Sequence, residues 1–327
     1  MESINYSVII RTTGKAHLKY KKLLESVSRL DPQPKEVLVV LPEGYAIPEE
    51  RLGCEQFLFC PKGMVRQRME GVAACTTDYA LFCDDDVTFP TDFVRKLHAP
   101  LKQGLGFFSA APLYSFLPEK GKNALINIIM GGAMPMVFHR RTRYVSVLKS
   151  TGYSYNRNLD RSPGRYYETQ SAAWTCFYAD IRAFRQLEFE KETWLDAHGY
   201  SAFDDQTMFY KAWLMGFKTI IVADTAYEHL DAKTSTKNNR PAVLYSKSFN
   251  RLVFWHRFIY SRQSCFAGRI LAALALSYRL ALISIDCWVK VLRHRMSWKD
   301  YAVQLKGLRD AKKYLKSDEY RRLPSFA

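Results

Sequence analysis

The sequence lacks the short motifs that identify several common classes of enzyme and binding protein. It contains no GxGxxG fingerprint, no GxxxxGKS/T phosphate loop and no GxSxG nucleophile motif, which argues against three frequent kinds of site. No RNA-recognition or helix–turn–helix signature accompanies its basic residues. Long apolar runs are missing as well. After Arg269 the longest uncharged stretch is Ile270–Tyr278, far short of the ~18 residues of a membrane-spanning helix.

Cysteine is present but forms no pattern. The seven cysteines, an odd number, include no CxxC pair and no zinc-site spacing, so we interpret them as reduced, buried small residues of a cytosolic protein. Residues Met1–Tyr6 have neither the basic nor the apolar region of a secretory signal. We therefore expect a cytoplasmic protein with no signal peptide and no transmembrane helix.

Acidic residues are scarce in the last third of the chain. The 327 residues include 48 Lys and Arg against 32 Asp and Glu, a net charge of +16. Residues 1–232 are nearly balanced, with 28 basic and 27 acidic residues. Residues 233–264 hold seven basic and no acidic residues, and residues 265–327 hold 13 and five. This division predicts a globular domain over 1–232 and a basic region over 233–327 that favours an anionic partner, either a nucleic acid, a membrane or a phosphorylated substrate.

The first domain alternates between strand and helix patterns. With 48% apolar and 14% aromatic residues, the chain can bury a large core. The predicted strands are Tyr6–Arg11, Val37–Leu41, Gln56–Cys60, Asp78–Cys83, a strand-like pattern over Thr169–Tyr178, and Lys218–Val222. Helices are predicted over residues 18–30 and 64–75 and between Asp205 and Leu214, with Gly216 closing the last one. The alternation predicts a doubly wound, mostly parallel α/β sheet.

Ligands of such sheets bind beyond the carboxyl ends of the strands. This places Thr12, Thr13, Glu43 and the triplet Asp84–Asp86 along one rim. Three adjacent carboxylates repel one another unless a cation or hydrogen bonds compensate. In an extended segment Asp84 and Asp86 point the same way and could bind one divalent ion together. The alternative is a solvated acidic turn before a helix; a calcium EF-hand fits poorly, because its sixth position would be Phe rather than Gly.

Two further acidic or metal-binding candidates follow in the chain. Asp204 and Asp205 stand at a helix start, where carboxylates also occur simply because they stabilise the first turn. His229 follows the last strand beside Glu228. A lone histidine is more often structural, although a neutral imidazole also suits Mn²⁺ or Zn²⁺.

In chain order these segments resemble the family 2 glycosyltransferases, whose nucleotide-sugar-binding fold is called GT-A. The residues that carry the resemblance are Ser7–Thr12, Arg68–Gly71, Asp84–Val87, Asp204–Asp205, Gly216–Lys218 and His229. The match covers about residues 6–232. The resemblance implies an inverting, metal-dependent enzyme that moves a sugar from a nucleotide-diphosphate donor to a hydroxyl group.

The resemblance also implies a donor site at the ends of the first and fourth strands. Thr12 and Thr13 would lie beside the nucleotide, and Arg68 would help to hold the nucleotide end of the donor. Asp84 and Asp86 match the family's DxD pair. Asp84 would lie near the ribose, and Asp86 would bind a Mn²⁺ or Mg²⁺ on the diphosphate. Both aspartates are therefore candidate metal ligands.

The remaining roles lie around this donor site. Asp205 would be the general base, with Asp204 as the next candidate, and His229 would approach the diphosphate or its metal. Glu43 and Asp85 share the rim and are counted with the donor-binding residues. The acceptor side would be lined by residues of the segment 169–175, among them Thr169, Gln170 and Trp174.

The sequence departs from the family pattern at several positions. Arg11 stands where a proline is usual, and Met69 replaces the asparagine that follows the arginine. The second strand runs into Glu43 rather than the aspartate that commonly reads the base, so the nucleotide stays open. The Gln-x-x-Arg-Trp motif of processive synthases is missing, which predicts the addition of a single sugar.

The basic region contains two segments that suit a membrane surface. On a wheel at ~100° per residue, four charged residues of segment 265–293 fall within about 60° of one another: Arg279, Asp286, Lys290 and Arg293. This predicts an amphipathic helix with a cationic stripe, and Phe249–Tyr260 is a second basic, aromatic segment. We expect residues 247–322 to bind the anionic inner face of a membrane. Packing on the catalytic domain or on a second subunit is the alternative.

The preferred interpretation is a cytoplasmic glycosyltransferase acting on a glycan or lipid-linked glycan, in cell-surface polysaccharide or lipopolysaccharide synthesis. A nucleic-acid-binding protein that uses the basic region is a second possibility, with strongly salt-dependent affinity. A third is a catalytically inert homologue that serves as an assembly partner. The retained Asp84, Asp86, Asp205 and His229 argue against that third role.

Overall fold

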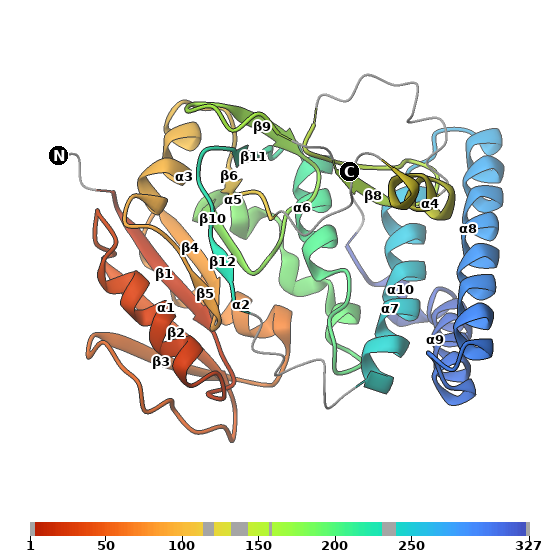
Figure 1. The fold of residues 1–327 in the computed structure, drawn as a ribbon, viewed down its shortest axis with the longest axis horizontal. Coiled ribbons are helices and arrows are strands. Elements are labelled where there is room, and N and C mark those ends of the chain that lie inside the picture. The colour runs from red at the N-terminus through yellow and green to blue at the C-terminus, as the bar shows by residue number, and fades with distance from the viewer. Residues whose placement is uncertain (1–3, 114–120, 132–142, 157–158, 231–239, 325–327) are drawn as a thin grey trace.

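The computed structural model describes residues 4–113, 121–131, 143–156, 159–230 and 240–324 (Figure 1). An eight-stranded sheet with strand order β3-β2-β1-β4-β10-β6-β11-β9 forms its centre. The four N-terminal strands are parallel, as are β6 and β11, while β10 and β9 run antiparallel to their neighbours. The predicted α/β fold with a mostly parallel sheet is therefore confirmed.

The strands of the large sheet are β1 (Tyr6–Arg11), β2 (Glu36–Pro42), β3 (Glu55–Cys60), β4 (Tyr79–Asp84), β6 (Phe108–Ala110), β9 (Tyr166–Thr169), β10 (Cys176–Asp180) and β11 (Thr219–Val222). Two small antiparallel sheets pair β5 (Val87–Thr88) with β12 (Glu228–His229), and β7 (Val145–Val147) with β8 (Ser154–Asn156). The α-helices among the described residues of the first 230 are α1 (Leu18–Ser28), α2 (Met64–Ala74), α3 (Phe93–Lys102), α4 (Lys122–Gly131), α5 (Ile181–Gln186) and α6 (Asp204–Leu214).

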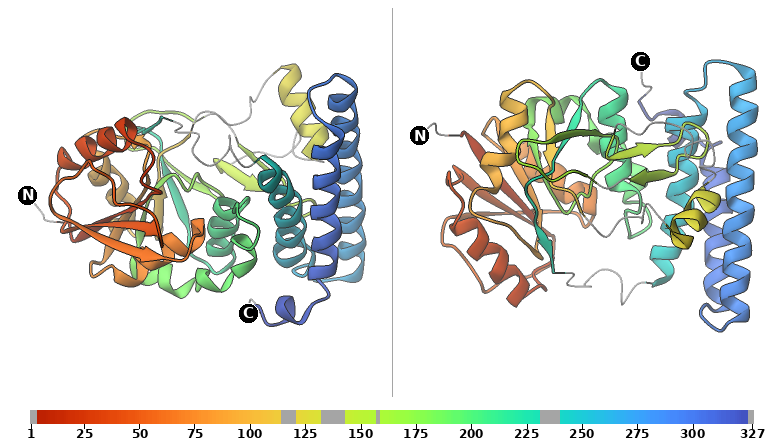
Figure 2. Two further views of the ribbon diagram at one scale, coloured as in Figure 1. Left: turned by 90° about the horizontal axis from the view of Figure 1, so that it is seen from below. Right: turned by 45° about the horizontal axis from the view of Figure 1, so that its top comes forward.

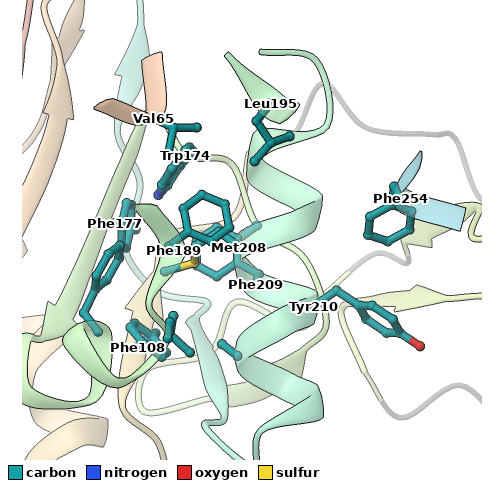
Figure 3. Packing of buried hydrophobic residues seen from close by; sticks show 14 of the residues in the cluster. Val65, Phe108, Trp174, Phe177, Phe189, Leu195, Met208, Phe209, Tyr210 and Phe254 are labelled. Carbon is teal, nitrogen blue, oxygen red and sulfur yellow. The ribbon is translucent and has the colours of Figure 1, made fainter. Parts of the chain in front are cut away.

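Helices cover both faces of the sheet, and the alternation of side chains along each strand explains how. In β1, Val8 and Ile10 join a core with α1 and α3, whereas Ile9 between them joins a second core with α2, α5 and α6. Successive side chains of a strand point to opposite faces, so one apolar run serves both cores. Figure 3 shows the second core, in which the ring centroid of Phe177 lies 5.3 Å from that of Phe209 on α6.

The strand predicted over Thr169–Tyr178 is wrong in its middle. β9 ends at Thr169 and pairs with β11, whereas β10 begins at Cys176 and lies between β4 and β6. Residues 170–175 form no strand and connect these two distant positions in the sheet. The pattern of apolar residues is continuous across the connection because that segment is itself buried.

The basic region is helical throughout its described part. It contains α7 (Arg240–Trp255), a π-helical turn (His256–Tyr260), α8 (Phe266–Leu292), α9 (Trp298–Tyr314) and α10 (Asp318–Arg321). Figure 1 shows α8 as the outermost helix, on the side of the molecule away from β1–β3. α7 belongs to the core that also contains α6.

The aromatic segment Phe249–Tyr260 is therefore no surface helix. Phe249, Phe254 and Phe258 are buried in the shared core, which corrects the prediction that this segment lies in a membrane interface. The sequence showed the aromatic residues, but it could not show that the first domain covers them. A membrane-binding surface that includes all of residues 247–322 is too broad for the same reason.

A buried ion cluster joins α7 and its π-helical turn to the first domain. The carboxylate of Glu192, which has no solvent exposure, accepts hydrogen bonds from Lys211 Nζ at 2.9 Å and from Arg257 at 2.8 and 3.0 Å. Lys211 is on α6 and Arg257 is in the π-helical turn. The Glu192 carboxylate thus neutralises two buried cations, one from the first domain and one from the basic helical region.

Replacing Glu192 by Ala should destabilise the protein by about 3–5 kcal/mol, because it leaves two cations buried without their counter-charge. The free energy of unfolding, obtained from denaturant titration, measures this effect. Asp92→Ala is the matched control, since Asp92 pairs with Lys96 in solvent and such pairs contribute about 0–1 kcal/mol. Equal effects of the two substitutions would contradict the central role given to Glu192.

Candidate active site

The carboxyl ends of β1 and β4 bring the predicted rim residues together. The two strands are parallel neighbours, and Arg11 lies directly opposite Asp84 in the register. The chain beyond these positions supplies Thr12 on one side and Asp85 and Asp86 on the other. All three aspartates are buried. Charged groups so poorly hydrated need hydrogen bonds or counter-charges, and each aspartate has a different set.

Asp84 is bound by two guanidinium groups. Arg11 Nε donates to Asp84 Oδ1 at 3.1 Å, and Arg11 Nη2 lies 3.0 Å from Oδ2, which gives a bidentate ion pair. Arg68 Nη2 donates to the same Oδ1 at 2.7 Å. Both carboxylate oxygens are therefore engaged by the protein's own cations. This arrangement makes Asp84 a poorer metal ligand than its position in the triplet suggests.

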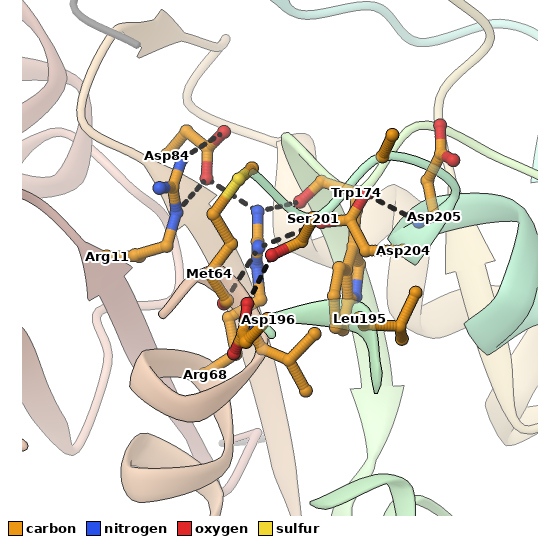
Figure 4. A network of polar contacts seen from close by, with 12 residues as sticks. Arg11, Met64, Arg68, Asp84, Trp174, Leu195, Asp196, Ser201, Asp204 and Asp205 are labelled. Carbon is orange, nitrogen blue, oxygen red and sulfur yellow. Dashed lines mark hydrogen bonds and ion pairs between the residues drawn. The ribbon is translucent and has the colours of Figure 1, made fainter. Parts of the chain in front are cut away.

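Arg68 is buried at the centre of a polar network (Figure 4). Its guanidinium also donates to the carbonyl oxygens of Met64 at 3.2 Å and Trp174 at 3.1 Å, and it stacks 4.2 Å from the Trp174 ring centroid. Arg68 Nη1 lies 3.7 Å from Asp204 Oδ2. One side chain thus connects β4, the 170–175 connection and the start of α6.

Helix α2 is held in the position that aims Arg68 into this network. The backbone N–H groups of Val65 and Arg66 donate to Asp196 at 3.1 and 2.9 Å, so a distant carboxylate satisfies the free donors of the helix start. Gly71 allows α2 to approach β1 closely, because a Cβ there would lie 2.4 Å from Ile9 Cγ2. The Gln67 amide donates to the carbonyl oxygens of Thr12 and Val40, which fixes α2 to the ends of β1 and β2.

Asp85 is paired with a hydroxyl group rather than with a cation. Thr12 Oγ1 donates to Asp85 Oδ2 at 2.6 Å. Thr12 Oγ1 also accepts a hydrogen bond from Gly14 N–H at 2.9 Å. Burial raises the pKa of Asp85 to about 6, although the Thr12 hydroxyl and the Arg11 charge oppose that rise. Thr12 is itself buried, so its side chain fixes the turn after β1.

Asp86 and His229 form a pair of possible metal donors. β12 pairs with β5, with His229 opposite Val87, and this brings His229 Nε2 to 3.2 Å from Asp86 Oδ1. A carboxylate oxygen and an imidazole nitrogen suit Mn²⁺. Within the described part of the chain, no three His, Cys, Asp or Glu side chains come close enough to hold a metal by themselves. These two side chains could supply only part of the coordination of such an ion.

Asp204 and Asp205 lie in the first turn of α6 and differ in their contacts. Asp204 is directed toward Arg68 and accepts from Asp205 N–H at 2.9 Å. Asp205 Oδ1 accepts from Gln206 N–H at 2.6 Å, and Figure 4 shows its carboxylate turned away from the Arg68 network. Burial, followed by the charge of Asp205, raises the pKa of Asp204 to about 7, and burial also raises that of Asp205.

The residues predicted for the acceptor side are largely enclosed. Thr169 is fully buried and accepts from Val145 N–H, and the Gln170 side chain accepts from Val147 N–H at 2.8 Å. Trp174 is 3% exposed and packs under Arg68. These side chains support β7 and hold the arginine in place. The other two rim residues differ, since Thr13 is half-buried and the Glu43 side chain is exposed.

The sequence interpretation missed four residues that build this site. Arg11 was visible only as a departure from the usual proline, and its pairing with Asp84 depends on the β1–β4 register. Gln67, Asp196 and Tyr227 act through contacts between distant segments, such as the 2.6 Å hydrogen bond between the Tyr227 and Thr175 hydroxyl groups. No local pattern of residue types predicts contacts between segments so far apart in the sequence.

Comparisons with known proteins agree with the resemblance seen in the sequence. A family model described as "Glycosyl transferase family 2" matches residues 58–178, which include Arg68 and the Asp84–Asp86 triplet. No curated protein sequence matches the chain. The predicted resemblance to the family 2 glycosyltransferases is confirmed, and these enzymes transfer sugars from nucleotide sugars.

Solved structures show the same fold at low sequence identity. Residues 1–349 of TarS from S. aureus, in complex with UDP-GlcNAc, superpose with a TM-score of 0.53 at 13% identity, covering 94% of this chain and 80% of that one. A second TarS structure gives 0.52 at 12% identity, with the same coverage. GalNAc-T7 with UDP, GalNAc and Mn²⁺ gives 0.50 at 12% identity, covering 86% of this chain and 57% of that one. The GT-A-type fold is confirmed.

Replacing Arg68 by Met should raise the pKa of Asp204 further, because the arginine charge opposes the effect of burial. Titration of the carboxyl ¹³C shifts by NMR measures the change, and Arg68→Lys should largely preserve the native value. Arg66→Met is the matched control, since Arg66 lies on the same helix but is exposed. An Asp204 pKa that is equally high in the Arg66 and Arg68 variants would show that Arg68 does not set it.

Proposed function

We propose that this chain is an inverting, non-processive glycosyltransferase that moves one sugar from a nucleotide-diphosphate donor to an acceptor hydroxyl group. The observation that carries the proposal is the position of Arg68 between Asp84, at 2.7 Å, and Asp204, at 3.7 Å. Two acidic motifs that are 120 positions apart thereby meet at the carboxyl edge of the sheet. Such an edge is where ligands bind in α/β sheets.

The donor is proposed to bind over the ends of β1 and β4. Thr12, Thr13 and Glu43 lie on the nucleotide side, and Asp84 lies on the ribose side, fixed by its two arginines. Asp85 stays hydrogen-bonded to Thr12 and shapes the turn. The similarity to structures that hold UDP or UDP-GlcNAc supports a uridine diphosphate sugar as the donor to be tested first.

A divalent metal, Mn²⁺ or Mg²⁺, is proposed to be held by Asp86 and His229 together with the donor diphosphate. Such an ion neutralises negative charge on the leaving diphosphate. Because Asp84 is already bound by Arg11 and Arg68, we assign Asp86 and His229, and not Asp84, as the protein's ligands of the metal. His229 must be neutral to offer its nitrogen.

The chemistry proposed for this chain's own residues is a single displacement. The Asp205 carboxylate takes the proton of the acceptor hydroxyl group while that oxygen bonds to the anomeric carbon of the sugar. The bond from the anomeric carbon to the diphosphate oxygen breaks in the same step, which inverts the configuration. Burial raises the pKa of Asp205, which makes its carboxylate a stronger base near neutral pH. Asp204, which is directed toward Arg68, is the second candidate for the general base.

The acceptor is proposed to be a glycan or lipid-linked glycan of cell-surface polysaccharide or lipopolysaccharide synthesis, reached at the cytoplasmic face of a membrane. The connection 170–175, with Thr169, Gln170 and Trp174, is proposed to position the acceptor side through the segments it supports. A catalytically inert assembly role and a nucleic-acid-binding role remain competing proposals. The pairing of Asp86 with His229 at 3.2 Å favours the enzyme over both of them.

Asp205→Asn should lower kcat by about 10²–10⁴-fold, because the amide cannot accept the acceptor proton, and should leave binding of the donor unchanged. Transfer assays with a UDP-sugar panel and calorimetric binding of UDP measure the two effects. Asp92→Asn serves as the control, since Asp92 immediately precedes α3 and pairs with Lys96 at the surface. Full activity of Asp205→Asn would remove it from the base role and make Asp204 the next residue to test.

The pH dependence of transfer should follow the same carboxyl pair. The base must be deprotonated, and burial raises the pKa of Asp204 to about 7 and that of Asp205 in the same direction. We therefore expect kcat to fall as the pH drops below neutrality, well above the range in which an ordinary aspartate titrates. A rate that is constant down to pH ~5 would contradict a base with a raised pKa.

Asp86→Ala should abolish the Mn²⁺-dependent part of nucleotide binding. A ligand bound only to the native state raises its apparent stability, so the thermal shift produced by UDP should depend on Mn²⁺ in the native protein and lose that dependence in the variant. Asp92→Ala is again the control. An unchanged Mn²⁺-dependent shift in Asp86→Ala would exclude Asp86 as the metal ligand.

A further inference from the structure

Helix α8 exposes an unusual number of large apolar side chains. Phe266, Leu271 and Leu274 are 78%, 66% and 63% exposed. The exposed large apolar residues of this helix are Phe266, Ile270, Leu271, Leu274, Tyr278, Ile285, Trp288, Val289 and Leu292. On a wheel of ~100° per residue these nine fall within an arc of about 140°. They form a continuous stripe along the helix, which we call the apolar face.

The opposite side of α8 is fixed to the protein. Ala272, Leu276, Cys287 and Val291 are buried along it. Arg279 is also buried there: its Nη1 donates to the Thr151 carbonyl oxygen at 3.2 Å, and its guanidinium lies 4.8 Å from the Tyr153 ring centroid. The predicted cationic stripe is therefore wrong at Arg279, which points into the molecule, whereas Lys290 and Arg293 near the end of the helix are exposed as predicted. Most of the large side chains that α8 exposes to solvent are apolar.

The apolar face continues onto two neighbouring helices. Leu125, Ile126 and Ile129 of α4 are exposed, and the Tyr278 hydroxyl group donates to the Ile129 carbonyl oxygen at 3.3 Å. Figure 2 shows α4 beside α8. On α9, Trp298 is 53% exposed, and its ring centroid lies 5.1 Å from that of Trp288.

Positive charge borders this apolar face. Near the C-terminal end of α8 and along α9 the chain exposes a group of basic residues: Lys290, Arg293, Arg295, Lys299, Lys306, Arg309, Lys312 and Lys313. Two of them pair with an acid, Lys290 with Asp286 at 2.5 Å and Lys313 with Asp310 at 4.0 Å. Tryptophan and basic side chains beside an apolar stripe match the chemistry of an anionic lipid surface, where the rings lie at headgroup level.

We propose that the apolar face of α8, extended by α4 and bordered by the basic residues of α9, binds an anionic lipid bilayer with α8 lying in the plane of the membrane. The occupant is a lipid surface rather than a second copy of the chain. Two copies joined through this face would bring their basic residues together, whereas anionic headgroups neutralise them.

α8 lies along the membrane and does not cross it. With 27 residues, most of them apolar, it is long and apolar enough to span a bilayer by length and composition alone. The sequence prediction of no membrane-spanning helix counted Arg279 as a break in the apolar run. However, the helix packs on the domain from Ala272 to Val291, so crossing would place the polar domain surface beside it in hydrocarbon.

The test is co-sedimentation of the full chain with vesicles of phosphatidylcholine, with or without phosphatidylglycerol, at low salt. We expect the chain to bind vesicles that contain phosphatidylglycerol and to lose binding when Leu271 and Leu274 are both replaced by Glu. Leu18→Glu is the matched control, because Leu18 is 74% exposed on α1, far from α8 in the fold. The pair Lys306→Glu and Arg309→Glu should weaken the preference for phosphatidylglycerol while preserving the fold.

Three results would overturn the proposal. One is an absence of binding to either vesicle, and another is equal loss of binding in Leu18→Glu. The third is a dimer in vesicle-free solution, seen by light scattering, that Leu271→Glu with Leu274→Glu converts to a monomer. Retention on vesicles after an alkaline carbonate wash would overturn the in-plane placement, since that wash releases peripheral proteins.

Membrane binding through α8 would place the proposed glycosyltransferase at a bilayer. The vesicle experiment itself needs neither donor nor acceptor. The thermal shift of UDP with Mn²⁺ should stay unchanged in the α8 double variant. Loss of vesicle binding together with retained UDP binding supports the surface by itself. Vesicle binding without any UDP response would contradict the proposed function and leave the membrane surface supported.

Discussion

The buried guanidinium of Arg68 is the interaction on which the site depends. It compensates Asp84, approaches Asp204 and stacks on Trp174, so that strand, connection and helix share one charge network. An arginine can serve this purpose because its planar fork binds several acceptors and keeps its charge when buried. The cost of burying it is offset only while every partner is present. The shape of the rim therefore follows from charge compensation as much as from the sheet.

The three aspartates of the triplet have different partners. Asp84 is paired with arginine, Asp85 accepts a hydrogen bond from a threonine hydroxyl group, and Asp86 lies beside a histidine. Three chemically identical side chains in a row thus acquire different properties from their neighbours. A second buried cluster, centred on Glu192, joins the helical region to the catalytic domain. The helical region is accordingly part of the same hydrophobic core and not a detached tail.

The net positive charge of the chain overstates the positive charge that its surface presents, because some of the basic residues are buried. Arg257 and Arg279 contribute to the total of +16 but are buried, one on Glu192 and the other beneath α8. Exposed basic residues occur over the whole surface, and those of α9 and the end of α8 have few acidic residues near them in the sequence. The apolar stripe of α8 accompanies them, and composition alone does not show that it faces outward.

The sequence by itself determined the α/β alternation, the mostly parallel sheet and the rim that carries the acidic triplet, because these follow from local periodicity and from the ends of short apolar runs. It also supplied the resemblance to the glycosyltransferases. Only the tertiary structure decided that Arg11 and Arg68 share Asp84, that residues 170–175 are no strand and that Phe249–Tyr260 is buried. These features depend on contacts between segments far apart in the chain, which no local pattern specifies.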